Sequence, residues 1–126
     1  MAKTVFIIDD SSTVLMSVES ILTRLGFNVE KARDGEEALS KLNSGLRPNL
    51  IITDINMPRM DGITFIGNAR TLGACRFTPI LVLTTEQEQQ KRNEARAKGA
   101  TGYLVKPVAA EQLKAVINQV LPGSIA

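Results

Sequence analysis

Apolar, β-rich runs alternate with helical patterns five times along this chain of 126 residues. The runs that we predict to be strands lie at 4–8, 28–32, 49–53, 79–84 and 102–105. The segments with helical periodicity lie at 12–25, 35–44, 63–73, 86–98 and 110–121. Strict alternation of strands and helices favours a parallel sheet covered by helices on both faces. The expected fold class is therefore α/β, with five parallel strands.

The predicted helix at 86–98 offers much less apolar surface than the others. Its only apolar residues are Ala95 and Ala97. Because little buried surface holds it, we expect it to be the most mobile helix. Glu88 and Arg92 have the spacing of a favourable ion pair along one helix face.

Composition indicates one soluble domain over residues 1–126. Apolar residues make up 44% of the chain and charged residues 22%, and the formal net charge is +2. These values do not indicate a nucleic-acid partner.

The single cysteine, Cys75, excludes an internal disulfide and suggests a reducing compartment. The N-terminal residues do not resemble a signal peptide and no run is long enough to span a membrane, so we expect a cytoplasmic protein without membrane contacts.

Three aspartates follow apolar runs at the points where strands are expected to end. Asp9 and Asp10 follow the first strand and Asp54 follows the third. In open α/β sheets, the carboxyl ends of the strands form the edge at which ligands bind. Three carboxylates in one site repel one another unless a cation joins them. With Lys106 after the fifth strand and before Pro107, the pattern predicts a metal-dependent acidic pocket with a lysine directed into it.

Five motifs occur in order along nearly the whole chain. They are Asp9-Asp10-Ser11, Asp34-Gly35-Glu36-Glu37-Ala38-Leu39, Asp54-Ile55-Asn56-Met57-Pro58 with Met60-Asp61-Gly62, Pro79-Ile80-Leu81-Val82-Leu83-Thr84, and Gly99-Ala100-Thr101-Gly102-Tyr103-Leu104-Val105-Lys106-Pro107. Together they resemble the receiver domain of two-component response regulators, and in particular single-domain, CheY-like chemotaxis regulators. The resemblance implies a flavodoxin-like (βα)5 fold with the strand order 2-1-3-4-5.

The same resemblance implies a phosphoryl-transfer site that depends on Mg²⁺. Asp54 would be the phosphoacceptor, taking a phosphoryl group from the phosphohistidine of a histidine kinase, since a carboxylate can act as a nucleophile. The Mg²⁺ cofactor would be bound by the carboxylates of Asp10 and Asp54, by the backbone carbonyl of Asn56, and by Asp9 through water. The chemistry would be limited to accepting and losing the phosphoryl group, so we do not expect an enzyme in the ordinary sense.

Further residues take their roles from this resemblance. Thr84 and Lys106 would contact the phosphoryl group, and the Lys106-Pro107 bond would be cis. Thr84 and Tyr103 would form the switch, which reshapes a target-binding face built from the fourth helix, fifth strand and fifth helix. Asn56 and Glu86 would control dephosphorylation, and their pairing is similar to that of fast-resetting chemotaxis regulators.

Several of these residues also fit other roles. Asp9 and Asp10 could be an acidic pair at a helix N-terminus, and Thr84 could be a capping residue. Lys106 could be a solvated loop lysine, and Tyr103 a half-buried strand aromatic. Within signalling, the protein could be a phosphorelay intermediate or a phosphate sink.

Two classes outside signalling share parts of the pattern. A haloacid-dehalogenase-type phosphatase also has an aspartate nucleophile, but it separates its two acids by one residue, whereas Asp9 and Asp10 are adjacent. A flavodoxin-like electron carrier needs a phosphate-binding loop after the first strand, where the acids of this chain would repel a flavin phosphate.

Overall fold

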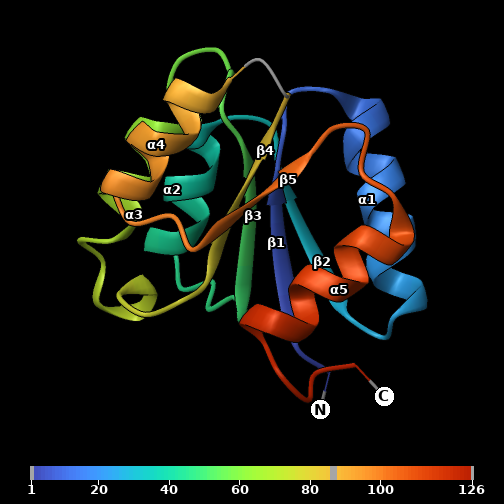
Figure 1. Ribbon diagram of the computed structural model, residues 1–126. Coiled ribbons are helices and arrows are strands. Elements are labelled where there is room, and N and C mark those ends of the chain that lie inside the picture. The colour runs from blue at the N-terminus through green and yellow to red at the C-terminus, as the bar shows by residue number, and fades with distance from the viewer. Residues whose placement is uncertain (1, 86–87, 126) are drawn as a thin grey trace.

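The computed structural model describes residues 2–85 and 88–125. Within them, five parallel strands form one sheet in the order β2-β1-β3-β4-β5 (Figure 1). The strands are β1 (Thr4–Ile8), β2 (Asn28–Ala32), β3 (Leu50–Asp54), β4 (Ile80–Thr84) and β5 (Gly102–Val105). The predicted α/β class and strand order are confirmed.

Helices cover both faces of this sheet. They are α1 (Ser12–Arg24), α2 (Gly35–Asn43), α3 (Gly62–Ala69), α4 (Gln89–Ala97) and α5 (Ala110–Val120), with a short 3₁₀ helix, η1 (Gly73–Cys75). Helices α1 and α5 lie on one face, and α2, α3 and α4 lie on the other (Figure 1). Within the described residues, none of the helices has the length and hydropathy needed to cross a bilayer.

The two layers of helices enclose two apolar clusters. One joins Leu15, Leu22 and Ile117 of α1 and α5 to the sheet, and the other joins Leu42 and Phe65 of α2 and α3 to its opposite face. Every residue of β3 and β4 is buried, whereas the edge strands β2 and β5 are partly exposed. This is the burial expected of central parallel strands covered on both sides. The sheet therefore gives a rigid base for side chains at its carboxyl edge.

The observed bounds differ from the predicted ones most at the third helix. It ends at Ala69 rather than at position 73, because the N–H groups of Thr71 and Leu72 bond to carbonyls three residues earlier and tighten the chain. The guanidinium of Arg70 then donates to the carbonyls of Cys75, Thr78 and Gly99. These tertiary contacts replace the predicted continuation of the helix.

Smaller shifts occur at two strands and at the other four helices, of which α1, α2 and α5 each end one residue earlier than predicted. Strand β3 ends on Asp54 instead of one residue before it, and β4 begins at Ile80, after Pro79. Helix α4 begins at Gln89 rather than at position 86, and residues 86 and 87 lie outside the described residues. Ala95 is the only buried residue that α4 contributes. Its small packed surface agrees with the weak anchoring predicted from the sequence.

Candidate functional site

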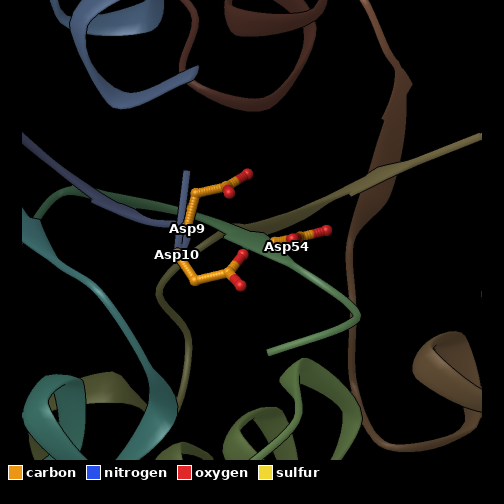
Figure 2. A group of neighbouring side chains, drawn as sticks. All are labelled: Asp9, Asp10 and Asp54. Carbon is orange, nitrogen blue, oxygen red and sulfur yellow. The ribbon is translucent and has the colours of Figure 1, made fainter. Parts of the chain in front are cut away.

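Three aspartates from two neighbouring strands meet at the carboxyl edge of the sheet. Asp9 and Asp10 follow β1, and Asp54 is the last residue of β3. Each offers a carboxylate oxygen, and these oxygens all lie within 4.8 Å of one another. Figure 2 shows the three side chains projecting into the same region from adjacent strand ends. Asp9 and Asp54 are buried, with 1% and 6% of their surface exposed, and Asp10 is exposed.

The backbone around Asp54 fixes the position of its carboxylate. Oδ1 accepts the backbone N–H of Ile55 at 2.8 Å. The chain folds back at Gly62, whose N–H donates to the Ile55 carbonyl at 2.7 Å. A Cβ atom at Gly62 would lie 2.0 Å from the carbonyl oxygen of Asp54, so this close approach requires glycine. Asp61, directly before Gly62, caps α3 by accepting the N–H of Thr64.

Lys106 reaches the acidic cluster from the end of β5. Its Nζ atom lies 3.1 Å from Asp9 Oδ2 and 3.1 Å from Asp54 Oδ1. Burial opposes the ammonium charge, but the two carboxylates outweigh it and raise the pKa of Lys106. Burial, and then repulsion by Asp9, raises the pKa of Asp54 above its ordinary value, although Lys106 opposes this. The Lys106-Pro107 bond is cis.

The donor set fits a hard divalent cation. Asp9 Oδ2 is buried and has no hydrogen bond within the described structure, although Lys106 lies within ion-pair distance. Its other oxygen, Oδ1, accepts the backbone N–H of Ser11 at 2.9 Å. Three carboxylates this close retain a mutual repulsion that one lysine offsets only in part. Oxygen ligands of this kind suit Mg²⁺, which is bound by few carboxylates and keeps several waters.

A second polar cluster adjoins the site at the end of β4. The hydroxyl of Thr84 lies 2.9 Å from Glu88 Oε2, and the same oxygen accepts the backbone N–H of Thr85 at 3.0 Å. The other oxygen, Oε1, accepts the side-chain amide of Asn56 at 2.5 Å. Lys91 of α4 donates to the amide oxygen of Asn56 at 2.6 Å. The Thr85 N–H, together with the Thr84 hydroxyl and the Asn56 amide, lowers the pKa of Glu88.

The sequence did not identify Glu88 as part of this cluster. Among the described ion pairs, the expected contact between Glu88 and Arg92 does not form. Instead, Arg92 lies over the ring of Tyr103, with its Cζ atom 4.4 Å from the ring centroid. A signal was present, because Thr85 and Glu88 have the T-x-x-E spacing of a capping box, in which the acid reaches back to the cap N–H.

The remaining predicted residues are placed as follows. Tyr103 lies on β5 with 44% of its surface exposed. Glu86, predicted to control dephosphorylation, lies outside the described residues. Asp9, Asp10, Asp54 and Lys106 come together as the sequence predicted.

Sequence comparison identifies the family. The profile described as the response regulator receiver domain matches residues 5–118. The chain belongs to the response regulator receiver family. It is 37% identical to chemotaxis protein CheY-3 of Vibrio cholerae serotype O1 over 117 residues, which cover 92% of this chain and 89% of the relative. It is 34% identical to protein PilG of Pseudomonas aeruginosa over 119 residues, covering 94% and 87%.

Structural comparison gives the same family. The chemotaxis response regulator CheY4 of Vibrio cholerae superposes with a TM-score of 0.89 at 42% identity, covering 96% of this chain and 100% of that one. The receiver domain of a signal transduction histidine kinase from Syntrophus aciditrophicus superposes with a TM-score of 0.87 at 30% identity, covering 97% and 92%. Membership of the receiver family decides against the phosphatase and flavodoxin alternatives. Receiver domains are regulators whose signalling generally involves aspartate phosphorylation and Mg²⁺.

Proposed function

We propose that this protein is a stand-alone response regulator that accepts a phosphoryl group on Asp54 from a histidine kinase. The observation that carries the proposal is the setting of the Asp54 carboxylate. It ends the central strand β3, is 6% exposed, lies beside two further carboxylates, and has Lys106 Nζ 3.1 Å from Oδ1. A nucleophile suits phosphoryl transfer when it is held at the edge of a rigid sheet, beside a lysine and beside carboxylates that could bind a cation.

The transfer exchanges one bond for another. Oδ1 is already engaged by Ile55 N–H and Lys106, so Oδ2 is the oxygen that forms the new O–P bond. The N–P bond of the kinase phosphohistidine breaks, and its electron pair returns to the imidazole nitrogen. Lys106 then offers its positive charge to the phosphoryl oxygens. Hydrolysis of the resulting acyl phosphate by water releases inorganic phosphate and restores the Asp54 carboxylate.

Mg²⁺ is the proposed cofactor. The carboxylates of Asp10 and Asp54 and the backbone carbonyl of Asn56 would bind it directly, and Asp9 would act through water. Bound there, the cation supplies positive charge that offsets the charge on the transferring group. The 4.8 Å grouping of the three carboxylates supports this assignment, as does the buried Asp9 Oδ2, which contacts Lys106 but accepts no hydrogen bond in the described structure.

The proposed output is a change in protein binding. Thr84 and Tyr103 act as the switch, with Thr84 at the end of β4 and Tyr103 on the edge strand β5. The target would bind the face formed by α4, β5 and α5. This face includes the exposed Tyr103 and the partly buried Arg92, which pack on each other and line one pocket with Arg96. A side chain that is exposed in one state and packed in another can bias such a two-state equilibrium.

Chemotaxis or motility is the proposed process, because CheY-3 and CheY4 carry that description and are similar over almost their full length. Dephosphorylation would be controlled by Asn56 and Glu86, and the site of action would be the cytoplasm. A phosphorelay intermediate or phosphate sink is the alternative within signalling. The discriminating observation is which protein binds only the phosphorylated form.

Replacing Asp54 by asparagine tests the proposal. Asp54→Asn should abolish labelling by acetyl phosphate in the presence of Mg²⁺, because the amide is not a nucleophile, and the fold should be unchanged. The matched control is Asp61→Asn, which alters another aspartate, at the end of the loop that follows β3, and should label like the parent protein. The measurement is incorporation of an acid-stable, base-labile phosphoryl group. Persistent labelling of Asp54→Asn would mean that another acid is the acceptor.

A further inference from the structure

Glu88 occupies hydrogen-bond donors that the phosphoryl group of the proposed reaction would need. Its carboxylate accepts from the Thr84 hydroxyl at 2.9 Å, from the Thr85 N–H at 3.0 Å and from the Asn56 amide. These donors come from two different segments, the end of β4 and the loop after β3. A carboxylate that gathers donors from separate parts of a site resembles a bound anion in its contacts.

The hydroxyl of Thr84 cannot serve two anions at once. A threonine side chain has one O–H donor, and here its nearest acceptor is Glu88 Oε2, with the Thr85 carbonyl at 3.1 Å as a second. A phosphoryl group on Asp54 would carry more charge than the carboxylate and would repel it at short range. Occupation of Thr84 by the phosphoryl group therefore requires Glu88 to leave.

Departure of Glu88 acts directly on α4, because Glu88 is the residue before its first turn. A second contact links the same helix to the site, since Lys91 donates to the amide oxygen of Asn56 at 2.6 Å. The Asn56 side chain is thus held on both sides by α4 and its preceding residue. With Ala95 as the one buried residue of α4, these polar contacts are a large part of what positions its N-terminal end.

We infer that Glu88 is an internal competitor of the phosphoryl group, a positioning residue that holds Thr84 and Asn56 in the unphosphorylated protein and releases α4 when Asp54 is phosphorylated. The inference rests on the proposed function of Asp54. It assigns a specific residue of this chain to the coupling between the site and α4, and it predicts that the competition slows phosphorylation.

The test compares acetyl phosphate labelling of the parent with Glu88→Gln and Glu88→Ala. Removing the competing charge should raise the rate at saturating donor about tenfold, which corresponds to about 1.4 kcal/mol of barrier. The control is Glu94→Gln, which removes one negative charge from an exposed position of α4 and should label at the parental rate. Without donor, the NMR signals of the Thr85 N–H and the Asn56 amide should shift in both Glu88 variants.

The outcomes separate the possibilities. If the NMR signals shift but both variants label at the parental rate or more slowly, Glu88 binds these donors without competing with the phosphoryl group, and the inference is wrong. If the signals do not shift, the contacts themselves are absent and the inference also fails. If the parent does not label at all, the proposed function of Asp54 fails, and the inference falls with it.

Discussion

Helices α2 and α4 have nine residues each and lie on the same face of the sheet, but the protein holds them in different ways. Helix α2 packs Ala38 and Leu42 into the apolar cluster, with exposures of 0% and 4%. Helix α4 contributes only Ala95. The stabilisation from apolar packing is non-directional and grows with the buried area. Packing therefore holds α2 against the sheet more strongly than it holds α4.

The first turns of the two helices differ as well. Asp34 caps α2 by accepting the N–H of Glu37 at 2.8 Å, and Arg59 binds the same carboxylate. Glu88 stands at the corresponding position of α4, but its side chain makes no capping bond into that helix. It accepts instead from Thr84, Thr85 and Asn56.

This difference explains how one helix can respond to the site while its neighbour does not. The position of α2 depends on packing and a local cap, neither of which involves a residue of the proposed reaction. The N-terminal end of α4 depends on polar contacts with Thr84 and Asn56, which another ligand of the same donors can replace. A few charge-assisted hydrogen bonds thus set the position of an element that buries little surface.

The largest predicted effect contrasts the packing of the two helices. Leu42→Ala should lower the free energy of unfolding by about 2–5 kcal/mol, because it removes a buried side chain and leaves a cavity. Ala95→Gly should cost about 1 kcal/mol, close to the intrinsic helix penalty of glycine. Ala97→Gly, at an exposed position of α4, is the control for that penalty. The measurement is urea unfolding, and an equal loss for Leu42→Ala and Ala95→Gly would break the comparison.

An intermediate effect is expected from Mg²⁺ without phosphodonor. At ten times its dissociation constant, a ligand that binds only the folded state stabilises it by about 1.4 kcal/mol. Asp10→Asn should remove most of this gain, because it removes a proposed ligand and part of the repulsion. The cost of Leu42→Ala and Ala95→Gly should be the same with and without Mg²⁺, since none of the three acids bonds to α4 in the described structure. Equal Mg²⁺-induced thermal shifts in the parent and Asp10→Asn would contradict the metal site.

The parts of this molecule that sequence predicts well are those set by local pattern. The bounds of β1, β2 and β5 agree with the predicted runs, and Asp9, Asp10 and Asp54 lie together because parallel strands end at one edge. The end of α3 was predicted too late, since it depends on the contacts of Arg70 with Gly99, 29 residues away.

The sequence alone could not show which partner Glu88 contacts, because that choice also depends on distant segments. Its spacing to Arg92 favoured a pair on one helix face, and its spacing to Thr85 favoured a capping box. The choice depends on donors from β4 and from Asn56, 32 residues away. Periodicity contains no information about such partners.

The smallest predicted effect distinguishes two contributions of Asp34 to stability, that of its negative charge and that of its capping hydrogen bond to α2. Arg59, and then the N–H of Glu37, lowers the pKa of Asp34 below the ordinary value of 3.8. A lowered pKa in the folded state adds stability that is present above 3.8 and is lost as the pH falls through the folded value. Asp34→Asn keeps a capping oxygen but has no charge, so the stability gap between parent and variant should narrow as the pH falls below 3.8.

Alanine variants at the two helix starts complete the comparison. Asp34→Ala removes the cap itself and should cost about 1 kcal/mol at neutral pH. Glu88→Ala should cost less, because Glu88 makes no capping bond into α4 and its contacts with Thr84, Thr85 and Asn56 are exposed or part-buried, so water can replace the carboxylate. Urea unfolding of the parent, Asp34→Asn, Asp34→Ala and Glu88→Ala at neutral and acidic pH gives each difference. A loss for Glu88→Ala as large as that for Asp34→Ala would show that the contacts of Glu88 stabilise the fold as strongly as a helix cap, and the contrast between the two helix starts would fail.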